Sequence, residues 1–207
     1  MNLPDEIKTI TSEAEFSLKE KGSLFISISR PIQTEEEANS FLNSIKKKYY
    51  DATHHCYSYK LVNGTFKYSD DGEPTGTAGI RIFNAQNHFD LTNVITIVIR
   101  FFGGVKLGVG PLGKTYYQSA FQNLENSQKE EFELYKNIEI NYSFEWSQLV
   151  HHLISKYSLI IEENLFVTHP QLICSIRNKS IEKFAQDLTS GSKNEVNFKI
   201  LGNSLYK

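Results

Sequence analysis

The segment that most constrains the fold is NVITIVIRFF, from Asn93 to Phe102. Apolar side chains occupy both the odd and the even positions along its middle. Because successive side chains of a strand point to opposite faces of the sheet, such a run needs cover on both faces. We therefore expect a central strand of a sheet here.

Further elements are expected around this strand. Residues 13–32 favour two strands joined by a turn at Lys21-Gly22. The hydroxyl of Thr34 is expected to cap a helix, with Glu37 completing a capping box. After this helix we expect a strand over HHCYSYKLV, a hairpin at Asn63-Gly64, a short helix with Ile80 and Phe83 facing inward, and a helix carrying Leu112, Tyr116, Ala120, Phe121 and Leu124.

The last third of the chain follows a different pattern. The charged segment ENSQKEEFELYK, residues 125–136, is interpreted as a linker. The segments after it alternate in the order β-α-β-β-α-β, which is typical of the ferredoxin-like arrangement. The expected fold class is α+β with two domains: an α/β sandwich over residues 1–128 and a ferredoxin-like domain over residues 136–207.

Composition limits the class of protein. A hydrophobic content of 40% is enough for a real core. No apolar run approaches the roughly 20 residues of a membrane helix, and the first ten residues lack the apolar core of a secretory signal. The only two cysteines, Cys56 and Cys174, are far apart in the chain, which argues against a disulfide framework. We expect a cytoplasmic protein without membrane partners; the oligomeric state stays open.

The net charge of −2 is spread evenly over the chain. Neither half is basic, and no motif that reads DNA sequence is present. Any nucleic-acid site must therefore be a local patch of positive charge rather than a property of the whole surface.

The segment GVGPLGKT, Gly108 to Thr115, fits the phosphate-loop pattern of nucleotide hydrolases. Its context argues against that interpretation. GGVKL separates it from the preceding strand, and no later apolar run ends in an aspartate that would hold magnesium. Two interpretations remain open: the glycines serve backbone geometry, or the loop and helix start, with Lys106 and Lys114, bind an anion without hydrolysing it.

The segment DATHHCYSY places His54, His55 and Cys56 next to one another. In a strand, His54 and Cys56 share one face and His55 lies on the other. Zinc needs three or four such ligands, and no second cluster has the required spacing. A Cys–His nucleophile is an alternative, but burial with satisfied hydrogen bonds is favoured, and no metal site is expected.

The segment SDDGEPTGTAG crowds Asp70, Asp71 and Glu73 into four positions. Three carboxylates so close in the sequence suit magnesium binding, or acid–base work if one carboxyl pKa is raised. The structural interpretation is favoured, because Asp-Gly and Glu-Pro are turn dipeptides and Asp or Thr side chains cap helices. A rigid polar loop beside an apolar sheet is also a common place for binding.

Four segments together resemble the YigZ/IMPACT family: KGSLFI, DATHHCYSY, SDDGEPTGTAG and IVIRFFGGVKLGVGPLGKTY, in this order and spacing. They cover residues 21–117, and the β-α-β-β-α-β pattern resembles the C-terminal domain of the family's bacterial members. The family's usual glycine-loop pattern is close to RYFGGIKLGTGGLVRAY. In this chain Pro111 stands where Gly is usual, Lys114 where Arg is usual, and Thr115 where Ala is usual.

The resemblance implies an N-terminal domain like the second domain of a small-subunit ribosomal protein. It also implies a link to translation, because eukaryotic relatives regulate translation by competing for an activator of a stress-responsive kinase. From it we expect a non-enzymatic regulatory or binding protein, without a cofactor, that contacts RNA, the ribosome or a protein partner.

The expected contact surface joins the DDGEPTGTAG and RFFGGVKLG loops, with Tyr57, Tyr59 or Phe102 as stacking faces for RNA bases. The alternative is a hydrolase or transferase acting on a phosphorylated or acylated small molecule, with Asp70, Asp71, Glu73, His54, His55 and Cys56 as its chemical groups. The residues expected to bind a ligand or anion are Thr75, Gly76, Thr77, Arg100, Gly103, Gly104, Lys106, Gly108 and Lys114.

Overall fold

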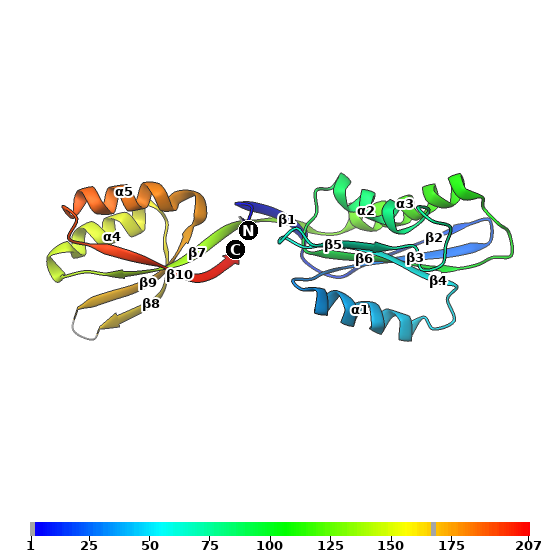
Figure 1. Ribbon diagram of the computed structural model, residues 1–207, viewed down its shortest axis with the longest axis horizontal. Helices are drawn as coiled ribbons and strands as arrows, with labels where there is room; N and C mark the ends of the chain where they lie inside the picture. The colour runs from blue at the N-terminus through cyan, green and yellow to red at the C-terminus, as the bar shows by residue number, and fades with distance from the viewer. Residues whose placement is uncertain (1–2, 167–168) are drawn as a thin grey trace. The chain divides into compact units, whose positions relative to one another are not determined.

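The computed structural model describes residues 3–166 and 169–207. The described chain divides into two compact units (Figure 1). The first unit is Ile7–Glu131, and the second combines Leu3–Glu6 with Phe132–Lys207. The sequence of the second unit is therefore interrupted by the whole of the first.

An antiparallel sheet forms the centre of the first unit, with strand order β2-β3-β6-β4-β5. The apolar run is the middle strand β6, which pairs with β3 and β4, so the expected central strand is confirmed. The turn at Lys21-Gly22 and the hairpin at Asn63-Gly64 also join strands as expected. The strands are β2 (Ala14–Glu20), β3 (Ser23–Pro31), β4 (His54–Lys60), β5 (Phe66–Ser69) and β6 (Val94–Phe101).

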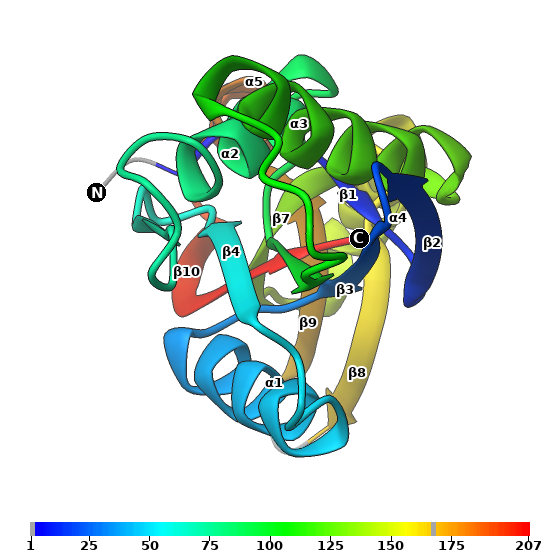
Figure 2. The ribbon, with the colours of Figure 1, turned by 90° about the vertical axis from the view of Figure 1, so that its right-hand side faces the viewer.

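Helices cover both faces of this sheet. α1 (Glu35–Lys48) lies on one face, and α2 (Gly79–His88) and α3 (Val109–Asn126) lie on the other (Figures 1 and 2). On β6 the isoleucines at alternate positions pack with α1, while Val94 and Val98 pack with α2 and α3. The two faces of β6 thus belong to two separate apolar cores, which explains why its middle is apolar on both faces, with the buried Thr96 as the polar exception.

The start of α1 follows its sequence signature. Thr34 is the N-cap, and its hydroxyl accepts a hydrogen bond of 3.1 Å from the backbone N–H of Glu37. The carboxylate of Glu37 accepts a bond of 2.7 Å from the N–H of Gln33, one residue before the cap. Such a cap contributes about 1 kcal/mol to helix stability.

The helix expected after the acidic loop is present as α2, but its buried face differs from the prediction. Ile82 is fully buried, whereas Ile80 and Phe83 are only partly buried. The buried position one turn later is the polar Gln86, whose amide donates to the hydroxyl of Thr96 at 3.1 Å and to two backbone carbonyls. A buried amide in the helix interrupted the apolar pattern on which the prediction relied.

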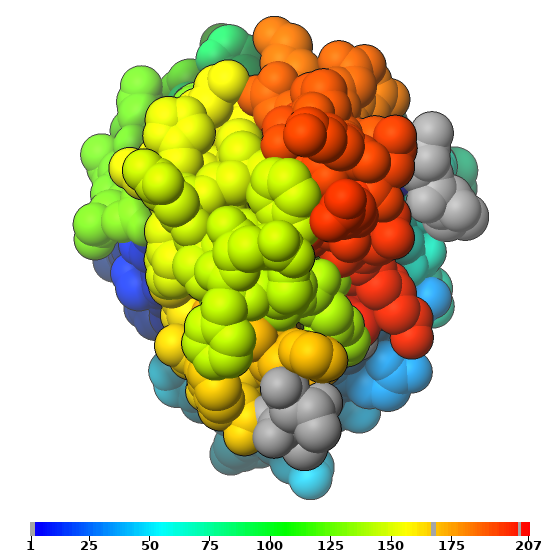
Figure 3. Space-filling view, turned by 90° about the vertical axis from the view of Figure 1, so that its left-hand side faces the viewer, coloured from blue at the N-terminus to red at the C-terminus, as the bar shows by residue number. Residues whose placement is uncertain are grey.

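The second unit has the expected β-α-β-β-α-β order. Its sheet is antiparallel, with β10, β7, β9 and β8 as successive neighbours. β1 (Glu6–Ile10) also pairs with β7, but of its residues only Glu6 belongs to this unit. α4 and α5 contact each other, and Figure 3 shows them side by side in yellow and orange. The elements are β7 (Lys129–Asn141), α4 (Ser147–Lys156), β8 (Ile160–Phe166), β9 (Pro170–Arg177), α5 (Ile181–Gly191) and β10 (Asn197–Tyr206), with short 3-10 turns at Phe144–Trp146 and Asn178–Ser180.

The boundary between the two units, at Glu131 and Phe132, falls within the segment 125–136 that was expected to be a linker, but most of this segment is regular secondary structure. α3 continues to Asn126, and β7 begins at Lys129. Leu134 and Tyr135 are buried within the strand. The frequent glutamates of this segment are typical of a solvated connection, but its backbone pairs into a sheet and most of its apolar side chains are buried. Among the described residues, no helix combines the length and the hydrophobicity needed to cross a membrane.

Candidate functional site

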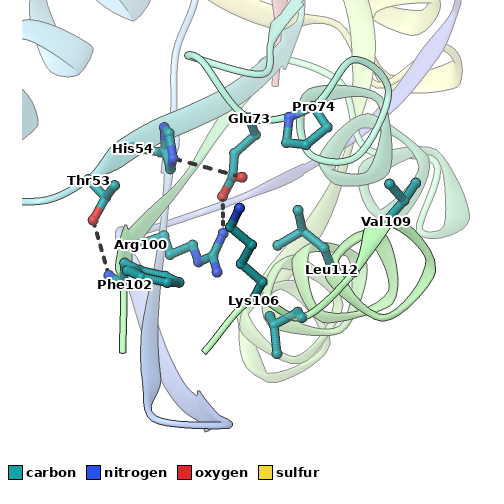
Figure 4. A pocket seen from close by; sticks show the side chains of 11 residues that line it. Thr53, His54, Glu73, Pro74, Arg100, Phe102, Lys106, Val109 and Leu112 are labelled. Atoms are coloured by element: carbon teal, nitrogen blue, oxygen red, sulfur yellow. Dashed lines mark hydrogen bonds and ion pairs between the residues drawn. The ribbon is translucent and has the colours of Figure 1, made fainter. Parts of the chain in front are cut away.

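A pocket of about 410 Å³ opens in the first unit where β4 begins and β6 ends (Figure 4). The antiparallel register places His54 opposite Arg100 at this end of the sheet. The acidic loop and the glycine-rich loop close the pocket from the side of α2 and α3. Its lining residues are Thr53, His54, Glu73, Pro74, Arg100, Phe102, Lys106, Leu107, Gly108, Val109 and Leu112.

A buried ion pair forms the floor of the pocket. Oε1 of Glu73 accepts hydrogen bonds from Nη1 of Arg100 at 2.6 Å and from the hydroxyl of Tyr116 at 2.7 Å. Glu73 is 8% exposed and Arg100 is 5% exposed. Charges this far from water persist in a protein when they are paired and hydrogen-bonded, as both of these are.

The guanidinium of Arg100 keeps donor capacity beyond this pair. Its central carbon lies 5.4 Å from the ring centre of Phe25 and 5.5 Å from that of Phe102. Nη2 has a weak contact of 3.5 Å with the hydroxyl of Ser23. Nε is buried and has no hydrogen-bond partner among the described residues. A buried donor without a partner costs free energy, but because Nε is inaccessible it is not a contact point for a ligand in the pocket.

His54 completes the polar part of the pocket. Its Nδ1 lies 2.8 Å from the backbone carbonyl of Asp71, which only accepts, so Nδ1 carries the proton. Nε2 then faces Oε2 of Glu73 at 3.8 Å (Figure 4). With a neutral imidazole these two atoms are acceptors, and the gap between them suits an N–H or O–H donor of a ligand.

The mouth of the pocket is aromatic and positively charged. The ring of Phe102 is 47% exposed, and Lys106 is exposed beside it. α3 begins here at its N-cap Gly108, where the first backbone N–H groups of a helix lack helical partners. Because Glu73 and Arg100 offset each other, Lys106 and the helix N-terminus leave this mouth net positive.

Two of the three carboxylates of the acidic loop lie outside the pocket. Asp70 holds the loop together: Oδ1 accepts from the N–H groups of Ala78 and Gly79 at 2.9 and 2.8 Å, and Oδ2 accepts from that of Gly76 at 2.9 Å. Asp71 sits at a positive φ of 44° and accepts from the backbone N–H of His55 at 2.6 Å. Only Glu73 of this trio is available to a ligand.

His55 and Cys56 are also engaged elsewhere. Nε2 of His55 lies 3.0 Å from the carbonyl of Tyr49, on the α1 side of the sheet. Sγ of Cys56 lies 3.0 Å from the carbonyl of Asp70 and 3.4 Å from the Tyr116 hydroxyl. Burial raises the pKa of the Cys56 thiol well above its usual range, so it stays neutral and is a poor nucleophile.

Some threonines and glycines of the two loops are packed or hydrogen-bonded within the fold, and others have open space beside them. Gly103 packs against the turn at Gly22, and a Cβ on it would lie 1.9 Å from the Gly22 carbonyl carbon. Gly76, Gly104 and Gly108 have positive φ angles of 77°, 87° and 83° with open space beside them. The hydroxyl of Thr77 donates to the carbonyl of Pro74 at 2.6 Å, while Thr75 is exposed.

The phosphate-loop match has no phosphate-loop geometry. Residues 109–126 are one helix, so Gly113, Lys114 and Thr115 lie inside α3 instead of in a loop before it. The hydroxyl of Thr115 donates back to the carbonyl of Pro111 at 2.9 Å. Lys114 does not line the pocket; it lines a separate cleft with Arg81.

For two of the three aromatic residues that were predicted to stack on bases, the prediction is wrong. Tyr57 and Tyr59 are 8% and 1% exposed and pack against α1, on the other face of the sheet. Phe102 alone of the three is exposed in the pocket. Conversely, Tyr116 was expected only as a core residue of a helix, yet its hydroxyl holds Glu73. Its helical spacing signals burial but gives no sign of this contact.

Among the described residues, no three histidine, cysteine or carboxylate side chains lie close enough together to hold a metal ion. The ionisable groups of the pocket are one carboxylate, one imidazole, one guanidinium and one ammonium. They can bind a ligand that carries both a negative group and hydrogen-bond donors, with flat apolar surface between them.

Comparisons with known proteins agree with this fold. The family model described as Impact N-terminal domain matches residues 21–124. A protein named IMPACT family member from Haemophilus influenzae is 32% identical over 197 residues, which cover 92% of this chain and 94% of that protein. IMPACT family member YvyE from Bacillus subtilis is 27% identical over 188 residues, covering 88% of this chain and 87% of its own.

Two further comparisons, one of sequence and one of structure, give weaker similarities. A Dictyostelium discoideum protein named Protein IMPACT homolog is 34% identical over 98 residues, which cover 44% of this chain and 28% of that protein. A crystal structure described as that of an hypothetical protein has a TM-score of 0.67 and 20% identity, and the match covers 97% of this chain and 100% of the other. At that identity the likeness concerns the fold alone.

The fold and the pocket define a two-unit α+β protein whose first unit carries a partly charged, partly aromatic pocket. The family match and the relatives then specify it further: the chain belongs to the IMPACT family.

Proposed function

We propose that this protein is a translation-linked binding protein whose first unit holds a nucleotide of single-stranded RNA in the pocket. The observation that carries the proposal is the exposed ring of Phe102 beside Lys106, above the buried Glu73–Arg100 pair. The translation link rests on family membership, and the choice of RNA rests on the chemistry of the pocket.

Charge supports a ligand with a phosphate. The floor pair is neutral as a whole, so Lys106 and the start of α3 decide the sign of the field at the mouth. Phosphate groups bind readily at helix N-termini, where free N–H groups and the helix dipole both favour an anion. The chain as a whole has a net charge of −2, so only this local patch favours RNA.

Shape supports a flat ring. Phe102 offers an aromatic face, and Pro74, Leu107 and Leu112 supply further apolar wall. Unpaired bases commonly stack on such faces, and each contact of this kind is worth about 1–3 kcal/mol. A volume of about 410 Å³ has room for one nucleotide, not for a folded RNA element.

The polar floor supports recognition of a base edge. Oε2 of Glu73 accepts hydrogen bonds, as does Nε2 of His54 when Nδ1 carries the proton, and Nη2 of Arg100, whose contact with Ser23 is weak at 3.5 Å, is a donor. Bases in single strands expose their edges as sets of donors and acceptors, which such a floor can match.

Substitutions of Phe102 and Lys106 test the proposal. Fluorescence anisotropy with a labelled unstructured RNA oligonucleotide measures the dissociation constant between about 50 and 200 mM salt. We expect Phe102→Ala to weaken binding about 5- to 150-fold, through loss of one stacked base, and Phe102→Tyr to restore it. Lys106→Ala is expected to lower the slope of log K against log salt by about 0.7, the value for one phosphate contact.

The matched control is Lys47→Ala, an exposed lysine on α1 at the opposite face of the sheet. Its salt slope is expected to equal that of the wild type. Absence of RNA binding by the wild-type protein, or equal affinities for the wild type and Phe102→Ala, would contradict the proposal and favour a protein partner.

A second candidate function, an enzyme acting on a phosphorylated or acylated small molecule, has one observation in its favour. Glu73 and His54 converge in the same concave pocket, with Lys106 at its mouth. Chromatography of nucleotides and acyl esters before and after incubation tests it. Turnover that disappears in His54→Gln, whose amide cannot take up a proton, would support the enzyme over the binding protein.

A further inference from the structure

A second cleft lies in the first unit between α2 and α3. Its volume is about 350 Å³, and it shares no lining residue with the pocket. The residues that line it are Arg81, Asn84, Gly110, Gly113, Lys114 and Tyr117. It contains the lysine of the phosphate-loop match, to which the pocket gives no role.

The charge of the cleft is positive and unopposed. Arg81 and Lys114 are both exposed, no carboxylate lines the cleft, and neither residue forms an ion pair within the described part of the chain. Nε of Arg81 donates to the carbonyl of Gly76 at 3.2 Å, which anchors the side chain and leaves both terminal nitrogens free. An anchored guanidinium next to an ammonium is well suited to a phosphate group.

Two glycines keep the α3 side of the cleft open. A Cβ on Gly113 would lie 3.3 Å from Nε and 3.7 Å from Cγ of Arg81, so this glycine lets the arginine rest on the helix backbone. At Gly110 a Cβ would meet nothing within 4 Å, so the space beside it is free. The amide of Asn84 and the hydroxyl of Tyr117 add uncharged hydrogen-bond donors.

The cleft and the pocket share the start of one helix. Gly108, Val109 and Leu112 of α3 line the pocket, whereas Gly110, Gly113 and Lys114 line the cleft. The two sites therefore lie on different sides of the same helical turns, and a helix with its side chains is about 10 Å across. A single nucleotide in the pocket does not extend around these turns, but a longer strand does.

We propose that the cleft is a phosphate subsite, in which Arg81 and Lys114 hold a backbone phosphate of the strand whose base occupies the pocket. This inference rests on the proposed function for the identity of the ligand. It adds that recognition extends beyond one nucleotide, and that Lys114 acts on the helix surface as a simple cation.

The first experiment uses inorganic pyrophosphate as the probe and backbone amide NMR as the readout. In the wild-type protein we expect the amide signals of Gly110 and Gly113 to shift as pyrophosphate is added. In the double variant Arg81→Ala, Lys114→Ala the shifts are expected to vanish, and Lys114→Arg is expected to retain them because the charge remains. No shift in the wild type, or an equal shift in the double variant, would overturn the phosphate subsite.

The second experiment compares ligands of two lengths by anisotropy or calorimetry. For an oligonucleotide, Arg81→Ala and Lys114→Ala are each expected to lower the salt slope, together by about 0.7 for one phosphate. For a mononucleotide, both variants are expected to bind like the wild type, while Lys106→Ala weakens both ligands. An unchanged oligonucleotide slope in the double variant would refute the inference.

The two experiments separate this inference from the proposed function. If the wild type binds no RNA but pyrophosphate shifts the glycine signals, the proposed function is wrong and with it the RNA strand as the ligand of the cleft. If RNA binds through Phe102 and Lys106 without any effect of Arg81 or Lys114, the proposed function stands and the subsite is refuted.

Discussion

Glu73 and Arg100 show how one buried pair can serve both the stability of the domain and its pocket. Both are at most 8% exposed, and Tyr116 adds a hydroxyl donor to the same carboxylate oxygen. Removing one partner leaves the other charge buried without compensation, whereas the intact pair gains less than that loss suggests.

Glu73→Gln is therefore expected to destabilise the first unit by about 3 kcal/mol, since breaking a buried pair typically costs about 3–5 kcal/mol and the amide oxygen keeps part of the bonding. Urea unfolding monitored by circular dichroism measures the change. The control is Glu13→Gln, an exposed glutamate for which almost no change is expected. A loss under about 1 kcal/mol for Glu73→Gln would show that the pair is not the anchor described here.

At the scale of residues, the sequence predicted the segments that line the pocket better than it predicted the role of each side chain in them. Asp70, Asp71 and Glu73 are equivalent by composition and spacing. Their roles separate only because Asp70 turns toward the N–H groups that open α2, and Asp71 takes a left-handed conformation that points it at β4. Such choices depend on the backbone path of neighbouring elements, which a pattern of residue types does not contain.

At the scale of elements, the glycine-rich segment between β6 and α3 contains glycines with opposite requirements. Gly103 touches the β2–β3 turn, where a Cβ would overlap the backbone of Gly22. Gly110 lies inside the first turns of α3 with open space beside it. The same residue type is thus obligatory at one position and replaceable at the other.

We expect Gly103→Ala to destabilise the first unit by several kcal/mol, because backbone cannot yield as a flexible side chain does. Gly110→Ala is expected to raise stability by up to about 1 kcal/mol, the usual helix preference of alanine over glycine. Thermal or urea unfolding of both variants beside the wild type measures this. Equal stability of the two variants would contradict the close contact at Gly103.

The secondary structure of the chain was largely predictable, and the errors have identifiable causes. The central strand, the cap at Thr34 and the two hairpin turns have strong local signals. The buried face of α2 was missed because Gln86, a polar residue, takes an inward position and satisfies its amide there. The first part of β7 was taken for a linker because charges flank its buried positions, Leu134 and Tyr135.

At the scale of the whole molecule, each unit contains one buried cysteine: Cys56 in the first unit and Cys174 in the second. Burial raises the pKa of the Cys174 thiol to about 11, and it raises that of Cys56 as well. At neutral pH both thiols therefore stay protonated and shielded in the native state, and each becomes reactive only when its own unit opens.

Thiol labelling in increasing urea, read by peptide mass spectrometry, is expected to give one transition for each cysteine. Because the first unit has its own cores, Glu73→Gln should move the Cys56 transition to lower urea and leave that of Cys174 in place. A joint shift of both transitions would mean that the two units unfold as one cooperative block. Labelling of either cysteine at neutral pH without urea would contradict its burial.

The interrupted path of the second unit has a consequence for synthesis on the ribosome. The first unit is complete once Glu131 has left the exit tunnel, and domains generally fold in the order in which they emerge. At that stage Asp5 and Glu6 lack their partners, which are synthesised later. The carbonyl of Asp5 accepts from the N–H of Leu134, and the carboxylate of Glu6 pairs with the ammonium of Lys179. A nascent chain stopped just after Glu131 would carry a folded first unit, with Leu3–Glu6 still unpaired. The second unit would fold last, when residues 132–207 become available to pair with Leu3–Glu6.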